Sequence, residues 1–280
     1  MKPVWMRLRV ALLWVCAVGT SYAGEPQPEF SFGVVPQQST VELARDWAPI
    51  LKYLEARTGF KLSFRTAPNI PEFERRVADG DYAFAYMNPY HYTVFSRSPG
   101  YRAFARQKDK RIRGLLVVSR DSSIQRLEDL KDTTIAFPAP NAFAASLLPR
   151  AQLRQLDIPF TPIYVSSHDS VYRAVALGLY PAGGGIERTL GTIDPDVRAR
   201  LRVLWRTPGY TAHALAARAD IATGVVAALQ QAMIAMSDSA EGAALLDGIG
   251  FAGIEAAKDS DWDDVRALNI DTLDALVGGR

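Results

Sequence analysis

The sequence predicts an α/β fold of two lobes joined by a hinge. Strand-like and helix-like segments alternate along most of the 280 residues, as in a sheet whose strands are connected by helices. This alternation occurs twice, and 48% hydrophobic residues are sufficient for two packed cores. A further pair of strand-like segments over 201–217 indicates that the chain returns from the second unit to the first. We therefore expect mixed sheets and two hinge crossovers.

The N-terminal residues 1–23 have the features of a secretory signal peptide. They begin with three positive charges, continue with an apolar run over 10–18 and end in the small-x-small cleavage site Ser21-Tyr22-Ala23. The run is too short to span a bilayer. Cys16 could instead mark a lipoprotein, but the residue before it is not small and the apolar run continues past it. We expect cleavage after Ala23 and a periplasmic protein.

Composition and motifs argue against several classes of protein. Without the signal peptide, 32 Lys and Arg become 29 against 30 Asp and Glu, so no basic surplus supports nucleic-acid binding. The only cysteine leaves with the signal, which excludes a disulfide or a thiol nucleophile. Nucleotide-binding, hydrolase and zinc motifs are absent, and Ser167, His168 and Asp169 are consecutive, so they cannot form a catalytic triad. We expect no enzyme activity, no cofactor and no metal site.

The first unit runs from Phe30 to Tyr86 and has the order βαβαβ. Ser39 and Glu42 form a capping box, and the apolar residues that follow recur with helical spacing until Gly59. The segments expected are a strand over 30–35, a helix over 39–59, a strand over 61–65, a helix over 71–80 and a strand over 82–86.

The second unit repeats this order and is followed by the return crossover. Gly183-Gly184-Gly185 is interpreted either as a flexible turn after a strand or as a place where a ligand or the other lobe approaches the backbone. Lobe one is expected over 24–115 and 213–280, and lobe two over 116–212. The segments expected are strands over 114–118, 134–137, 161–165, 201–205 and 214–217, helices over 142–156, 168–177 and 221–236, and a helical, polar tail.

Seven segments, in order along nearly the whole mature chain, form a recognisable pattern. They are Gly33-Val34-Val35-Pro36, Ala67-Pro68-Asn69, the strand that ends in Tyr86, Leu127 to Lys131, Phe137-Pro138-Ala139-Pro140-Asn141, Ser167-His168-Asp169 and Ala182-Gly183-Gly184-Gly185. Together these segments resemble type II periplasmic solute-binding proteins, and most closely the phosphate/phosphite/phosphonate-binding group that supplies ABC transporters. The resemblance implies a small-molecule ligand between the lobes, an ABC permease as partner and a monomer.

The resemblance also implies which residues surround the ligand. In the family a tyrosine after the third strand, a histidine that opens a helix and a Ser/Thr-rich helix start contact the anion, and Tyr86 and His168 match the first two. The helix start has no hydroxyl before Ser146, Ile70 stands at a tyrosine position, and His213 replaces an acidic residue. The expected ligand-binding residues are Tyr86, Asn141, Ala142, Phe143, Ala144, Ser146, His168, Gly184 and His213.

Each of these residues also has a structural interpretation. Tyr86 could be a core tyrosine, His168 could make only local hydrogen bonds, and Arg188 could bind an anion or be solvated. Backbone N–H groups at a helix start can hold an anion without hydroxyls. Because Phe143 makes that wall apolar, we hypothesise that phosphonates bind weakly and that the ligand has an apolar surface. The alternative function is a sensing protein that binds such a solute and signals to a membrane receptor or histidine kinase.

Overall fold

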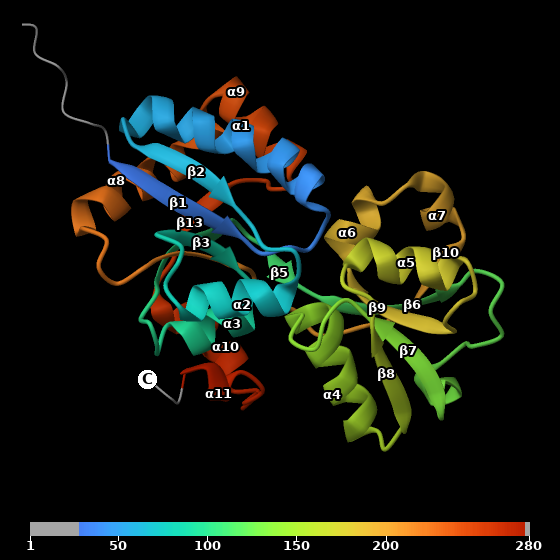
Figure 1. Cartoon of the computed structure of the whole chain (residues 1–280). Coiled ribbons are helices and arrows are strands. Elements are labelled where there is room, and N and C mark those ends of the chain that lie inside the picture. Colours follow the sequence, from blue (N-terminus) through green and yellow to red (C-terminus); the bar gives the residue numbers. More distant parts are fainter. Residues whose placement is uncertain (1–27, 278–280) are drawn as a thin grey trace, which may run out of the picture.

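The computed structural model describes residues 28–277, in two lobes (Figure 1). The expected signal peptide and Cys16 lie outside the described residues. We call the six-stranded sheet and its helices lobe one, and the five-stranded sheet and its helices lobe two. The strand orders are β13-β4-β12-β3-β1-β2 and β10-β6-β9-β7-β8. Within 28–277, no helix is both long enough and apolar enough to cross a membrane.

Lobe one contains the first predicted unit and the C-terminal part of the chain. Strands β1, β2 and β3 are parallel, whereas β12 pairs antiparallel with β3 and β4, so the sheet is mixed. Figure 1 shows helices α8 and α9 beside the N-terminal helix α1, and α10 and α11 beside α3. The strands are β1 (Glu29–Val34), β2 (Lys61–Arg65), β3 (Phe84–Met87), β4 (Arg102–Gln107), β12 (Ala214–Ala217) and β13 (Ile254–Ala256), and the helices are α1 (Thr40–Thr58), α2 (Ile70–Ala78), α3 (Pro89–Phe95), α8 (Thr223–Ile234), α9 (Ala240–Gly248), α10 (Asp263–Arg266) and α11 (Asp274–Val277).

The capping signals in the sequence set the ends of α1. Ser39 is the N-cap, and its capping box with Glu42 is formed. Gly59 ends the helix in the left-handed conformation at φ 73°, which glycine adopts without steric cost. The apolar face predicted from helical spacing is buried against the sheet. Local sequence therefore determines both the length of α1 and its orientation on lobe one.

Lobe two contains the second unit. Strands β7, β8 and β9 are parallel, and β6 and β10 extend the sheet antiparallel. Alternate residues of β6 and β7 enter two separate apolar clusters, as expected for the two faces of a strand. The strands are β6 (Gly114–Ser119), β7 (Thr133–Phe137), β8 (Phe160–Tyr164), β9 (Ala182–Ile186) and β10 (Leu201–Arg206), and the helices are the π-helix η2 (Phe143–Leu147), α4 (Leu148–Gln155), α5 (His168–Ala176), α6 (Glu187–Thr192) and α7 (Pro195–Ala199).

Gly183, Gly184 and Gly185 form the buried strand β9, so the interpretation as a flexible turn is wrong. A Cβ on Gly184 would lie 1.9 Å from the carbonyl oxygen of Ala145, and one on Gly185 would lie 2.1 Å from the hydroxyl of Tyr172. Both positions have to be glycine because helices of the same lobe lie directly on the strand. The close approach predicted from the glycines exists, but the partners are η2 and α5 rather than the other lobe.

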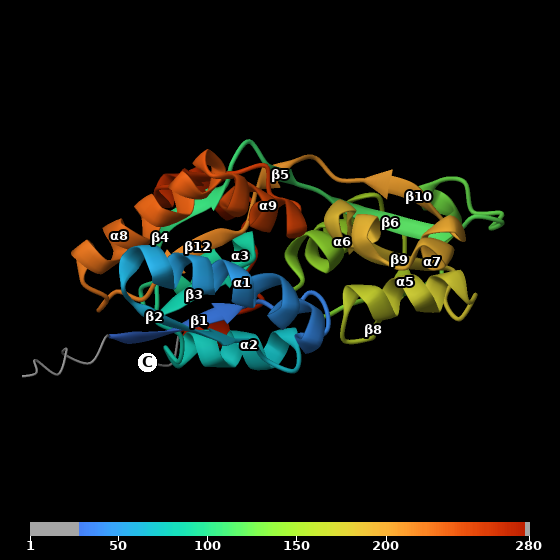
Figure 2. The same cartoon turned by 90° about the horizontal axis from the view of Figure 1, so that it is seen from above.

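The chain crosses between the lobes twice, and the two crossovers are paired. β5 (Arg111–Ile112) leads into lobe two and β11 (Tyr210–Thr211) leads back, and they form a short antiparallel sheet. Figure 2 shows β5 where the two lobes meet. The expected lobe boundary at 115/116 falls within β6, and the one at 212/213 falls between β11 and β12. These boundaries stay a prediction.

Candidate ligand-binding site

Two small cavities lie at the junction of the lobes and contain most of the expected ligand-binding residues. The inner cavity has a volume of about 10 Å³ and is lined by Val35, Gln37, Ile70, Asn88, Ile112, Ala142, Phe143, Ala144, Ala145, His168, Ile186 and His213. The hinge cavity has a volume of about 30 Å³ and is lined by Tyr86, Gln107, Lys110, Arg111, Ile112, Arg113, Ile186, Glu187, Arg188, Ala212 and His213.

The volumes show that the lobes are closely packed against each other. A cavity needs roughly 10–15 Å³ to hold one water molecule, so the inner cavity has room for about one. Pockets for small molecules usually measure about 300–1,000 Å³. A ligand of several heavy atoms therefore requires the lobes to move apart before it can enter between them.

The helix start in lobe two presents unpaired backbone N–H groups to the inner cavity. Ala142 is the N-cap of η2, which continues directly into α4. Among the described residues, no hydrogen bond is found to the amides of Phe143, Ala144 and Ala145. Unpaired amides at a helix start carry a partial positive charge, and they bind anions well. Phe143, Ala144 and Ala145 thus contribute backbone donors, whereas the amide of Ala142 donates to the carbonyl of Ala139, and none of these residues has a side-chain hydroxyl.

His168 lies beside these amides, at the start of α5. Ser167 is the N-cap of this helix, and His168 is buried with Nδ1 3.0 Å from Oγ1 of Thr189. No hydrogen bond to Nε2 is found among the described residues. Burial, with a smaller contribution from Arg188, lowers the pKa of His168 to about 3. The side chain is therefore neutral at pH 7, and it can donate to an anion from Nε2 when Thr189 donates to Nδ1.

Tyr86 and His213 form a stacked pair in lobe one, on β3 and just before β12. Their ring centroids are 4.9 Å apart, with an interplanar angle of 19°. Burial raises the pKa of Tyr86 to about 12, so its hydroxyl keeps its proton at pH 7. That hydroxyl has no protein partner among the described residues and belongs to a residue of the hinge cavity. It is a donor available from lobe one.

Arg188 connects the lobes across the cavities through Gln37. The Arg188 guanidinium on α6 donates to Oε1 of Gln37, and Nε2 of Gln37 lies 3.0 Å from Nε2 of His213. Since a guanidinium only donates, the amide of Gln37 must face His213 with its NH₂ group. His213 then accepts at Nε2 and carries its proton on Nδ1. Its pKa is well below 6.5 because of burial and the nearby Arg188, which agrees with this neutral state.

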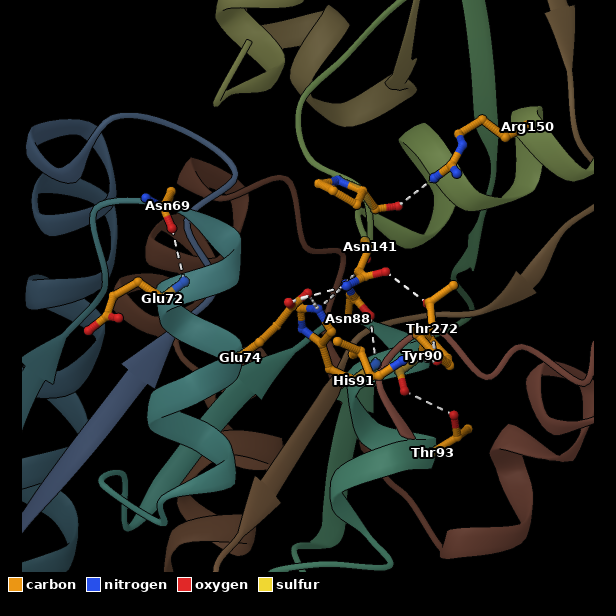
Figure 3. Close-up of polar contacts among 12 residues, drawn as sticks. Asn69, Glu72, Glu74, Asn88, Tyr90, His91, Thr93, Asn141, Arg150 and Thr272 are labelled. Carbon is orange, nitrogen blue, oxygen red and sulfur yellow. Dashed lines mark hydrogen bonds and ion pairs between the residues drawn. The ribbon is translucent and has the colours of Figure 1, made fainter. Parts of the chain in front are cut away.

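A second connection between the lobes involves Asn141 (Figure 3). Its Nδ2 donates to Oε2 of Glu74 at 3.3 Å, and its Oδ1 accepts from Thr272 at 2.8 Å. Its backbone carbonyl accepts from Nδ2 of Asn88 at 3.2 Å. We call this set the Asn141 contact. Asn141 was expected to bind ligand; its side chain contacts Glu74 and Thr272 of lobe one, and its role in ligand binding stays a prediction.

The buried pair of Glu74 and His91 supports the Asn141 contact. His91 is fully buried, with Nε2 2.9 Å from Oε1 of Glu74 and 2.9 Å from Nδ2 of Asn88, and no hydrogen-bond partner of its Nδ1 is found among the described residues. Because the carboxylate of Glu74 only accepts, Nε2 of His91 is the donor of their hydrogen bond. Glu74 then accepts from His91 and from Asn141, one from each lobe. Separation of the lobes removes one of these two donors.

The remaining expected residues are not exposed to either cavity. Ser146 is fully buried, and its Oγ has no hydrogen-bond partner in the described residues. Gly184 is covered by the Ala145 carbonyl and the ring of Phe137. Neither lines the inner or the hinge cavity. Residues 28–277 contain no group of three His, Cys, Asp or Glu side chains arranged to hold a metal ion.

The sequence matches one protein-family model over residues 32–262, and the family is described as "ABC transporter, phosphonate, periplasmic substrate-binding protein". The chain belongs to this family. It is therefore a periplasmic substrate-binding protein of the ABC-transporter type, and its partners are a small-molecule ligand and an ABC permease. The resemblance found in the sequence and the type II fold are confirmed.

Individual relatives of this binding protein are distant. It is 22% identical over 238 residues to the phosphate-import protein PhnD of Mycolicibacterium smegmatis. The match covers 71% of this chain and 70% of that protein. A binding component of an ABC phosphonate transporter from Pseudomonas aeruginosa has a TM-score of 0.80 at 20% identity, covering 87% and 86% of the two chains. PhnD1 of Prochlorococcus marinus, solved with methylphosphonate, has a TM-score of 0.78 at 18% identity, covering 86% and 98%.

Three residues of the junction were not selected from the sequence. Gln37 and Glu74 are single polar residues without a motif, and Thr272 lies in the tail. Glu74 carries a detectable signal, because it occupies an apolar position of α2, between Ile70, Phe73 and Val77, all buried. A carboxylate on the buried face of a helix requires a partner, and here the partners come from α3 and from the other lobe.

Proposed function

We propose that this binding protein holds a small tetrahedral oxyanion, such as a phosphonate, phosphite or phosphate, between its lobes, and that it acts without catalysis. The observation that carries the proposal is the donor set around the inner cavity. Three unpaired amides at the η2 start and His168 belong to lobe two, and Gln37 and His213 face them from lobe one. Hydrogen bonds to a charged group contribute roughly 1.5–3 kcal/mol each.

Electrostatics supports an anion rather than a neutral or cationic solute. Arg188 adds a positive charge beside the cavities, and its hydrogen-bond acceptor there is the neutral amide of Gln37. Both histidines are neutral, and no carboxylate lines the inner cavity. Because an anion contacts groups of both lobes, its binding favours the closed arrangement. Closure on a ligand is the signal that a permease needs to distinguish loaded from unloaded binding protein.

A thermal-shift panel tests the proposal directly. A ligand at 100 times its Kd adds about 2.7 kcal/mol to the stability of the folded state. We expect stabilisation by at least one of phosphate, phosphite, methylphosphonate and aminoethylphosphonate, with sulfate and acetate as comparison anions. A panel in which none of the phosphorus oxyanions shifts the melting curve contradicts the proposal.

Two variants test the residues in solution. Tyr86→Phe and His168→Ala each remove a hydrogen-bond donor, and we expect a loss of roughly 1–3 kcal/mol in binding by calorimetry. Tyr82→Phe is the matched control, because Tyr82 is a buried lobe-one tyrosine outside both cavities. Unchanged affinity in both test variants, or an equal loss in the control, places the binding site elsewhere.

A further inference from the structure

The hinge cavity is lined by more positive than negative side chains, whereas no charged side chain of the described Lys, Arg, Asp or Glu residues lines the inner cavity. Four of its lining residues are cationic, and they are Lys110, Arg111, Arg113 and Arg188. Its single carboxylate is Glu187, which pairs with Arg206 at 2.8 Å. Arg111 pairs with Asp264 at 2.7 Å. Of the four cations, three therefore remain without a carboxylate partner among the described residues.

Two of these three cations are partly shielded from solvent. Lys110 and Arg188 are half-buried, whereas Arg113 is exposed. Burial next to apolar walls such as Ile112 and Ile186 strengthens the field of a charge, because the surroundings polarise less than water. Of these cations, Arg188 contributes to the low pKa values of His168 and His213, for which burial is the larger cause. An anionic group in the hinge cavity would offset the repulsion among these cations.

The two cavities are neighbours, so one short molecule can reach both. Ile112, Ile186 and His213 line the inner cavity and the hinge cavity alike. The donors differ between them: the inner cavity offers backbone amides and His168, and the hinge cavity offers the Tyr86 hydroxyl and the cations. We propose that the hinge cavity binds a second anionic group of the ligand, so that the protein selects phosphonates bearing a carboxylate or second phosphoryl group. This inference rests on the proposed function.

The same geometry predicts which phosphonates are rejected. An ammonium group placed beside Lys110 and Arg188 meets like charges, and the only carboxylate of the hinge cavity is already paired. Methylphosphonate leaves the cations without a partner. The expected order of affinity is phosphonoacetate first, then methylphosphonate, then 2-aminoethylphosphonate.

Calorimetry with these three compounds on the mature protein tests the inference. We expect phosphonoacetate to bind at least tenfold more tightly than methylphosphonate. Lys110→Met and Arg188→Met should each reduce that ratio by fivefold or more, because they remove the cations that distinguish the ligands. Lys108→Met is the matched control, since Lys108 is an exposed lysine two residues away that does not line the cavity. It should leave the ratio unchanged.

The outcomes distinguish failure of the second-anion inference from failure of the oxyanion proposal. Equal binding of phosphonoacetate and methylphosphonate, or tighter binding of aminoethylphosphonate, overturns the second-anion inference and leaves the oxyanion proposal intact. A ratio that Lys108→Met reduces as much as Lys110→Met also overturns it, because a general charge effect would then be sufficient. Failure of all three compounds and of phosphate and phosphite to bind overturns both.

Discussion

The Asn141 contact and the Arg188–Gln37 contact both join the lobes, but they differ in how their polar groups are satisfied. At the Asn141 contact both ends of the amide are hydrogen-bonded, and the acid it meets is paired with His91. At Arg188 a guanidinium meets only a neutral amide beside two cavities. A satisfied, buried network is suited to holding the lobes together, whereas unsatisfied donors are available for a ligand. Closure and recognition are therefore assigned to different residues.

The largest expected effect tests whether the Asn141 contact is structural. Glu74→Ala leaves Nε2 of His91 and Nδ2 of Asn141 without their buried acceptor, and we expect it to lower the free energy of unfolding by about 2–6 kcal/mol, since each unsatisfied buried donor costs about 1–3 kcal/mol. Urea denaturation measures the change. Glu72→Ala is the control on the same helix, because Glu72 is partly exposed and its ion pairs with Arg75 and Arg76 contribute about 0–1 kcal/mol. Similar losses in the two variants would contradict the assignment.

A smaller effect sharpens the link between this contact and closure. Asn141→Ala removes the acceptor of Thr272 and one donor to Glu74, which should cost about 1–3 kcal/mol. It should also increase the radius of gyration in small-angle scattering, because the lobes separate more often. Asn69→Ala removes the N-cap of α2 and lowers stability by about 1 kcal/mol without touching lobe two. Scattering that is unchanged in Asn141→Ala would show that the contact does not control closure.

The free energy of unfolding should depend on pH through the neutral, buried His168 beside the inner cavity. The folded-state pKa of His168, about 3, is below its ordinary value of 6.5. Between these two pH values the unfolded chain binds more protons than the folded protein, so the free energy of unfolding decreases as the pH is lowered. At pH 5 the contribution of His168 is about 2 kcal/mol, at 1.36 kcal/mol per pH unit. Wild type should therefore lose about 2 kcal/mol more than His168→Gln between pH 7 and pH 5. Parallel stability curves would argue against a neutral buried His168.

The effect that is smallest per group concerns the missing hydroxyls at the helix start. Replacing Ala142, Phe143 and Ala144 with Ser, Thr and Ser should increase affinity for methylphosphonate by about 0.5–1.5 kcal/mol per hydroxyl, as measured by calorimetry. Such an increase would support the hypothesis that the native ligand presents an apolar surface to Phe143, whose ring packs edge-on against Tyr210. If wild type already binds methylphosphonate at submicromolar strength, near −8 kcal/mol, the amides alone are adequate and that hypothesis fails.

Local signals in the sequence predicted the fold well. The capping box and Gly59 defined α1, and periodicity predicted the first βαβαβ unit and the return crossover, whereas strand β9 of the second unit was not predicted. Strand β4 was not predicted, because Arg102–Gln107 mixes charged and apolar residues without regular alternation. The expectation of a helical tail was wrong at Ile254–Ala256, which forms strand β13 and pairs with β4. The glycines of β9 were misread because glycine is common in turns, and only the packing of η2 and α5 explains them.

The sequence could predict only those groups of the candidate site whose position is set by residues next to them in the chain. His168 at a helix start and the amides after Asn141 follow from local order along the chain. The roles of Gln37, Glu74 and Thr272 depend on partners between 67 and 176 residues away in sequence, which no single-sequence pattern reports. For the same reason the sequence did not predict the contacts of Asn141 with Glu74 and Thr272.

The pairing of β5 with β11 gives lobe two adjacent entry and exit points. Tyr210 lies opposite Ile112, and Thr211 opposite Arg111, so everything between them forms an insertion whose two ends meet. Such a module can be exchanged between homologous proteins, by recombination or by design, with two neighbouring splices and no rebuilding of the host. The η2 start, His168 and Arg188 would travel together in that exchange. Ligand preference could thus evolve as a cassette, while lobe one keeps its own core.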